Sequence, residues 1–163
     1  MPGDFPAATA NGAASATVID FFGALITPKA TAATTDGAVD VAEQIVPAGF
    51  ATPLHVHHRE DECFYILDGV VAFRLGAEVF VAQPGSFVRL PRNIPHAFRV
   101  RSAMPARMLV LGLPSGLVAF YVAVGAPSSP GAAAALRPVD VPRLVQVGAL
   151  FGIEVLGPPP ADL

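Results

Sequence analysis

The sequence predicts an all-β fold that closes into a barrel or sandwich, with one or two helices near the C-terminus. Glycine and proline contribute 15 and 17 of the 163 residues and are spread along the chain. Short runs rich in β-branched residues lie between them, which is the pattern of many short strands joined by tight turns. After Leu113 the pattern becomes helical. The length suits one domain.

The expected strands follow one another as a meander. Turns at "LDGV", "RLGAE", "AQPGS" and "LPRNIP" separate most of them. Neighbouring strands in a meander pair antiparallel, and closure of the sheet removes exposed strand edges. We expect strands at residues 15–29, 39–47, 55–57, 62–67, 70–75, 78–82, 86–90, 96–101 and 107–113.

Two helices are expected beyond the last strand. The segment "PSGLVAFYVAVG" has Pro114 at its start and glycine at its end, as helices often do. After a small-residue linker, "VDVPRLVQVGALFGIEVLG" offers Asp140 as an N-cap and Pro142 in the first turn. The chain therefore divides into a disordered arm at 1–14, a β-barrel at 15–113 and a helical extension packed on the barrel at 114–163.

Composition argues against several classes of partner. The formal net charge is −3 and Lys and Arg are scattered, so neither nucleic acid nor a membrane surface is expected to bind. No apolar run approaches the ~20 residues that span a bilayer, and the N-terminus lacks the basic and apolar regions of a signal peptide. The single cysteine, Cys63, excludes an intrachain disulfide. These features favour a cytoplasmic protein.

Three of the four histidines lie in "HVHHREDE", residues 55–62. Because alternate side chains of a strand share a face, His55 and His57 point together and His58 points away. Glu62 faces the same interior from the next strand. Imidazoles and a carboxylate are ligands that a borderline divalent metal accepts, and a cation would neutralise such a cluster inside an apolar barrel.

The fourth histidine fits the same site. His96 opens the strand "HAFRV", where it alternates with charged residues and shares a face with Phe98 and Val100. His96 therefore faces inward and can complete a site of three histidines and one glutamate.

The spacing of these residues resembles two motifs of the cupin superfamily. The first is Gly, five residues, His-x-His, three or four residues, Glu, six residues and Gly. Every fixed position is present in this chain, at Gly49, His55, His57, Glu62 and Gly69.

The second motif is Gly, five residues, Pro-x-Gly, two residues, His, three residues and Asn. The chain has Gly85, Pro91 and His96, but Asn93 replaces the second Gly and Val100 replaces Asn. Asn tolerates a left-handed turn, so the first departure is mild. The second suggests an apolar ligand.

The resemblance implies a single-domain cupin, that is, a double-stranded β-helix or jelly-roll barrel. It implies one divalent transition metal (Fe, Ni, Mn, Co, Cu or Zn), held by His55, His57, Glu62 and His96. The flanking segments look like small bacterial cupins grouped with quercetin 2,3-dioxygenases. We therefore expect a metal-dependent dioxygenase that cleaves a flavonol or related phenolic with O2 and uses Glu62 also as a general base.

Other functions stay open, because the fold alone does not decide function. One is an isomerase or cyclase that acts on a polyketide-like aromatic compound with the same base. Another is a non-catalytic small-molecule-binding cupin. A homodimer is expected in each case, because 53% of the residues are hydrophobic, above the ~45–50% typical of globular domains.

The substrate pocket is expected to be apolar, although ordinary core packing is the alternative for each of its side chains. Glu60 and Asp61 are interpreted as solvated turn residues, with Glu60 as an alternative ligand to Glu62. Cys63 is expected to be a packed small side chain, and Arg89 either anchors an anionic substrate or pairs with an acid across the sheet. The candidate pocket residues are Phe64, Phe73, Phe87, Phe98, Val100 and Met108.

Overall fold

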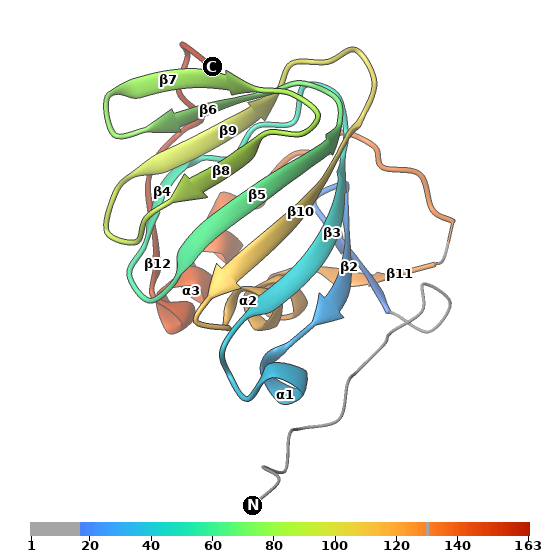
Figure 1. The fold of residues 1–163 in the computed structure, drawn as a ribbon, viewed down its shortest axis with the longest axis vertical. Helices are drawn as coiled ribbons and strands as arrows, with labels where there is room; N and C mark the ends of the chain where they lie inside the picture. Colours follow the sequence, from blue (N-terminus) through green and yellow to red (C-terminus); the bar gives the residue numbers. More distant parts are fainter. Residues whose placement is uncertain (1–16, 130) are drawn as a thin grey trace, which may run out of the picture.

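The structure, a computed structural model, describes residues 17–129 and 131–163 and contains two antiparallel sheets (Figure 1). The arm expected at 1–14 lies outside the described residues. The elements are β1 (Val18–Phe21), β2 (Ala24–Ala30), α1 (Ala32–Thr35), β3 (Asp40–Val46), β4 (Leu54–His57), β5 (Asp61–Asp68), β6 (Val71–Leu75), β7 (Glu78–Ala82), β8 (Phe87–Leu90), β9 (His96–Val100), β10 (Ala106–Leu113), α2 (Leu117–Val124), β11 (Ala126–Ser128), α3 (Val141–Phe151) and β12 (Ile153–Gly157).

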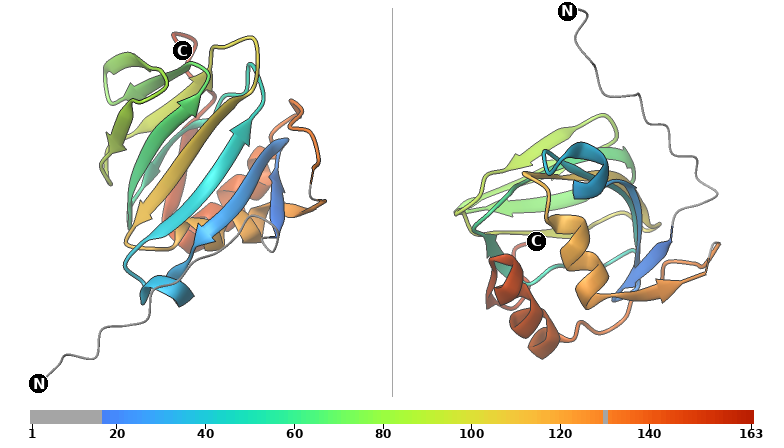
Figure 2. Two further views of the ribbon diagram at one scale, coloured as in Figure 1. Left: turned by 45° about the vertical axis from the view of Figure 1, so that its right-hand side comes forward. Right: turned by 90° about the horizontal axis from the view of Figure 1, so that it is seen from below.

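The two sheets form the walls of a jelly-roll barrel, which confirms the predicted fold class. One sheet has the strand order β11-β1-β2-β3-β10-β5-β8 and the other has the order β12-β4-β9-β6-β7. The helices α2 and α3 gather at one end of the barrel (Figures 1 and 2). None of the helices in the described residues has the length and apolar character required to cross a membrane.

The first expected strand is in fact a hairpin. A turn at Phe22 and Gly23 separates β1 from β2, and both residues have positive φ, at 54° and 93°. Two-residue hairpin turns of this kind match the twist of the strands but normally use Asn or Gly. The Oδ1 atom of Asp20 accepts a hydrogen bond from the Gly23 N–H at 2.8 Å, which helps to hold the turn.

Residues 114–163 supply strands as well as helices. Asp140 caps α3 by accepting a hydrogen bond from the Arg143 N–H at 3.0 Å, as predicted. The helix ends at Phe151 because Gly152 adopts the left-handed conformation at φ 75°. The chain then continues as β12, which pairs with β4, while β11 pairs with β1. The extension is thus part of both sheets.

Aromatic side chains fill the space between the two sheets. The ring centroids of Phe64, Phe73 and Phe98 lie 5.3 to 5.9 Å apart, and all three side chains are buried. Phe64 comes from one sheet, while Phe73 and Phe98 are paired across β6 and β9 of the other. Such tilted aromatic contacts stabilise a core beyond the area that they bury.

Candidate metal centre

Strands of both sheets bring the four predicted donors together. His55 and His57 lie on β4, and His55 pairs directly with His96 on β9. Glu62 faces them from β5 in the opposite sheet. One donor atom from each of these residues lies within 4.8 Å of the others, so the cluster could hold a metal ion. The alternation inferred from the sequence places them correctly.

Two of the imidazoles are held by backbone carbonyls. The Nδ1 atom of His55 lies 2.8 Å from the Pro53 oxygen, and Nδ1 of His96 lies 2.9 Å from the Ile94 oxygen. Because a carbonyl can only accept, each Nδ1 carries the proton and donates it. The Nε2 atom of each ring is then left with a lone pair that can bind a metal.

The third imidazole is held by Glu60. The His57 Nδ1–H donates to Glu60 Oε1 at 2.7 Å, and both side chains are buried. The interpretation of Glu60 as a solvated turn residue is therefore wrong. The turn between β4 and β5 directs its carboxylate inward, where the hydrogen bond from His57 compensates for lost hydration. A carboxylate behind a ligand histidine is the usual arrangement around protein metals.

An unsatisfied atom supports metal binding at this cluster. Nε2 of His96 is buried and has no hydrogen-bond partner, although it lies 3.3 Å from Oε2 of Glu62. Buried polar atoms without partners are rare, and an ion is one of their common explanations. Three nitrogen donors and one oxygen donor suit several divalent transition metals.

Burial and the neighbouring charges set the protonation of these groups. Burial, His96 and His57 together lower the pKa of His55 to about 3, so His55 is neutral at pH 7. Burial alone would raise the pKa of Glu62, but the contact with His96 and the charges of the imidazoles lower it to about 2. Burial opposes protonation of His57, yet the bond to Glu60 and the charges of Glu62 and Glu60 together outweigh it, so the pKa of His57 is raised.

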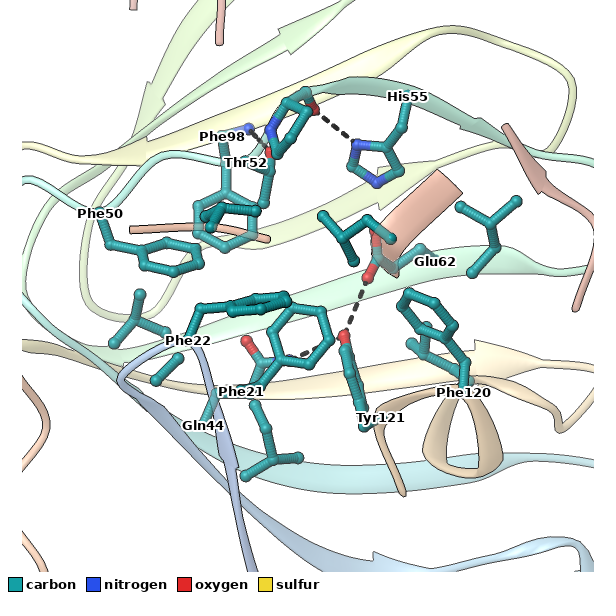
Figure 3. Close-up of a pocket in the computed structure, with 18 of the residues that line it drawn as sticks. Phe21, Phe22, Gln44, Phe50, Thr52, His55, Glu62, Phe98, Phe120 and Tyr121 are labelled. Carbon is teal, nitrogen blue, oxygen red and sulfur yellow. Dashed lines mark hydrogen bonds between the residues drawn. The ribbon is translucent and has the colours of Figure 1, made fainter. Parts of the chain in front are cut away.

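The cluster opens into a cavity walled by aromatic rings and aliphatic side chains (Figure 3). No lysine or arginine occurs among the described residues that line it. The whole hollow with its open mouth measures about 720 Å³, but only about 60 Å³ is open to the centres of water molecules. The cavity as it stands therefore has room for a few waters.

Only one of the six predicted pocket residues lines this cavity, namely Phe98. Phe64, Phe73, Val100 and Met108 are buried in the barrel core instead.

Phe87 is a clear correction, because 63% of it is exposed. On β8 the inward positions belong to Val88 and Leu90, so Phe87 faces outward beside Tyr65 of β5.

Most of the aromatic wall comes from residues that the sequence analysis did not single out. Phe21 and Phe22 reach the cavity from the β1–β2 hairpin, Phe50 from the loop before β4, and Phe120 and Tyr121 from α2. The sequence offers one signal for Tyr121. It is the sole polar side chain in the helical segment "LVAFYVAV", and a buried tyrosine hydroxyl normally has a partner.

Tyr121 connects α2 to the donor cluster. Its hydroxyl donates to Glu62 Oε1 at 3.5 Å and accepts from Gln44 Nε2 at 2.9 Å. Burial and the charge of Glu62 raise the pKa of Tyr121 well above its ordinary value, so the phenol keeps its proton at neutral pH.

Other polar residues near the motif have surface roles. His58 is exposed and lies 3.0 Å from Asn93 Oδ1, as expected for a side chain on the opposite face. Arg89 pairs with Asp61 at 2.6 Å, the second of its two expected roles. Asn93 adopts φ 64°, so it occupies the left-handed turn expected of it. Cys63 is buried and unpaired.

Comparison with known proteins agrees with this geometry. Residues 42–112 match the cupin domain family. An uncharacterized protein of Methanocaldococcus jannaschii is 34% identical over 74 residues, which cover 45% of this chain and 59% of that protein. The quercetin 2,3-dioxygenase of Bacillus subtilis is 29% identical over 79 residues, 48% of this chain and 23% of that protein. The match thus spans 59% and 23% of these relatives.

Solved structures show the same fold at low identity. An RmlC-like cupin from Shewanella frigidimarina has a TM-score of 0.57 at 12% identity, over 67% of this chain and 93% of that one. A predicted oxalate decarboxylase from Thermotoga maritima has a TM-score of 0.57 at 17% identity, over 66% and 99%. The sequence match over residues 42–112 and the fold agree over the same strands, which supports a place for the chain in the cupin superfamily.

Proposed function

We propose that this protein is a metal-dependent dioxygenase that cleaves a flavonol or related phenolic with O2. The observation that carries the proposal is the position of the donor cluster, at the end of a cavity walled by aromatic rings. The similarity to the quercetin 2,3-dioxygenase of Bacillus subtilis supports it, although it spans 23% of that protein.

The cavity wall favours a neutral aromatic substrate. Its lining includes Phe21, Phe22, Phe50, Phe98 and Phe120, and neither lysine nor arginine occurs among its described lining residues. Apolar pockets with a few convergent polar groups typically bind small molecules of matching character. A flat phenolic would present its enolic oxygen to the donor cluster and its rings to the phenylalanines.

The chain's own residues divide the chemical work. His55, His57, His96 and Glu62 would hold the ion. Glu62 would also take the proton from the enolic hydroxyl of the substrate. A bound divalent metal supplies a Lewis acid for the deprotonated substrate and, depending on the ion, redox chemistry with O2. The aromatic walls exclude water from the reacting atoms.

A ligand of flavonol size requires movement at the mouth of the cavity. About 60 Å³ is open to water centres, whereas pockets for drug-sized ligands measure roughly 300–1,000 Å³. The hollow including its mouth reaches about 720 Å³. Displacement of lining rings such as those of Phe21, Phe22 and Phe120 would enlarge the space open to a ligand.

Oxygen uptake with quercetin by protein loaded with each candidate ion tests the proposal. We expect uptake by the wild type, and a loss of turnover of about 10²–10⁴-fold in Glu62→Gln at retained metal content, as for loss of a general base. O2-independent conversion of a phenolic polyketide would instead establish an isomerase or cyclase. Binding of phenolics without conversion would establish a non-catalytic binder.

A further inference from the structure

Tyr121 stands out because its hydroxyl reaches the donor cluster from α2, outside the strands that carry the four donors (Figure 3). The tyrosine is buried, and its hydroxyl lies between Gln44 of β3 and Glu62 of β5. These three side chains form a polar chain through a wall that is otherwise mostly apolar.

The chain of hydrogen bonds has one direction. The Gln44 amide donates to the tyrosine oxygen at 2.9 Å, so the single phenol proton is free to be donated onward. Glu62 Oε1 accepts it at 3.5 Å, the long end of the hydrogen-bond range. The other oxygen, Oε2, lies 3.3 Å from Nε2 of His96. The two oxygens of Glu62 therefore have separate neighbours.

The tyrosine has little freedom to leave this position. Asp40 Oδ2 accepts hydrogen bonds from the Gly116 and Val118 N–H groups at 2.7 and 2.9 Å, which fixes the start of α2. Asp40 lies on the same strand as Gln44, so β3 holds both the helix and the hydroxyl. The ring of Phe21 packs edge-on against Tyr121 at 5.1 Å.

We propose that Tyr121 is a positioning residue for Glu62. Its hydroxyl holds Oε1, so that Oε2, the oxygen nearer to His96 Nε2, would be the one left to bind an ion. Oε1 is then the atom that accepts the proton of the substrate, a step that rests on the proposed function. The orientation of the ligand does not depend on which reaction the protein performs.

The test compares Tyr121→Phe in two backgrounds, the wild type and Glu62→Ala. Ni²⁺ affinity of the metal-free full chain is measured by chelator competition, together with kcat and KM for O2 uptake with quercetin. In the wild-type background we expect Ni²⁺ affinity to fall by about 10-fold, as for loss of an outer hydrogen bond to a ligand. We also expect kcat to fall while KM stays the same. In Glu62→Ala the same change should leave Ni²⁺ affinity unaltered.

Tyr65→Phe is the matched control. Tyr65 is the chain's other tyrosine, and 40% of it is exposed on the outer face of β5. Removal of that hydroxyl should leave both Ni²⁺ affinity and turnover unchanged. If Tyr121→Phe does not fold, Gln44→Met is used instead, because it removes the donor that orients the phenol. It should lower Ni²⁺ affinity in the wild-type background by less than Tyr121→Phe would, and leave it unaltered in Glu62→Ala.

Each outcome decides the matter. An equal fall of Ni²⁺ affinity in both backgrounds, or no fall in either, overturns the positioning role. The expected pattern of Ni²⁺ affinities without any O2 uptake by the wild type supports the positioning role and overturns flavonol oxygenation. The two proposals therefore fail in distinguishable ways.

Discussion

Glu60 gives the sharpest test of the metal centre, because it separates the donors from the residues that orient them. Its carboxylate accepts from His57 Nδ1–H at 2.7 Å, and the two side chains are only 3% and 4% exposed. Glu60→Gln keeps an oxygen that can accept this hydrogen bond but removes the charge. Glu60→Ala leaves the buried N–H unpaired, which costs about 1–3 kcal/mol.

The expected losses follow from this geometry. Outer partners of ligand histidines typically contribute 10–100-fold in metal affinity. We expect Ni²⁺ affinity to fall by about 10-fold in Glu60→Gln and by up to ~100-fold in Glu60→Ala, which is about 1.4 and 2.7 kcal/mol. Chelator competition at pH 7.5 measures the affinity, and circular dichroism verifies the fold.

Asp61→Asn is the matched control for Glu60, because it removes the next carboxylate along the chain, at the start of β5. Asp61 pairs with Arg89 and Arg92 at the surface and touches none of the donors. Its Ni²⁺ affinity should equal that of the wild type. Wild-type affinity in Glu60→Ala would refute the idea that Glu60 orients His57. Equal losses in the Glu60 and Asp61 variants would show that the turn matters only as a fold element.

Three further predictions follow from the same structure. The metal-free protein should be most stable near pH 6.5. Below that pH the unfolded chain binds more protons than the folded chain, because folding lowers the pKa of His55 to about 3 and that of Glu62 to about 2. The free energy of unfolding therefore falls with pH, first through His55 and, below 4.5, also through Glu62. Above pH 6.5 the stabilising protonation of His57, whose pKa is raised, is progressively lost. Urea unfolding from pH 4 to 8 measures this, and a flat profile contradicts it. Phe22→Gly should be more stable than Phe22→Ala by roughly 0.5–1 kcal/mol, because φ is 54° there. At Phe21, which lies inside a strand, the alanine variant should be more stable than the glycine variant. The same order of stability at both positions would refute backbone strain at Phe22. The protein should form a homodimer, and light scattering that finds only monomer at high micromolar concentration would refute this.

The donors could be predicted from the sequence because strand alternation and short spacing determine them locally. His55 and His57 are two residues apart on one strand, and Glu62 follows after a short turn. Successive side chains of a strand point to opposite faces of the sheet, so the face of each residue can be inferred without knowing the rest of the fold. The same reasoning placed Phe98 on the inner face of β9.

Features that depend on distant segments could not be obtained in this way. Glu60 lies in the turn between β4 and β5, where strand alternation does not apply. Its burial depends on how this turn packs against His57. Strand alternation places Phe64, Phe98 and Val100 inward, but it does not distinguish the core from the cavity. Phe87 does not face inward at all, because the inward positions of β8 are Val88 and Leu90.

The candidate metal donors and the cavity wall come from different parts of the chain, which limits what similarity to other cupins can say about function. The cupin match covers residues 42–112 and includes all four donors. Much of the cavity wall lies outside this stretch, including Phe22 before it and Phe120 and Tyr121 after it. Similarity over the matched stretch therefore bears on the candidate metal donors, whereas it says little about the part of the cavity wall that lies in the flanking segments. Tyr121 of the C-terminal extension hydrogen-bonds to Glu62, so the extension also contacts the group proposed as the base. Exchange of α2 between two such cupins should accordingly alter turnover as well as substrate choice.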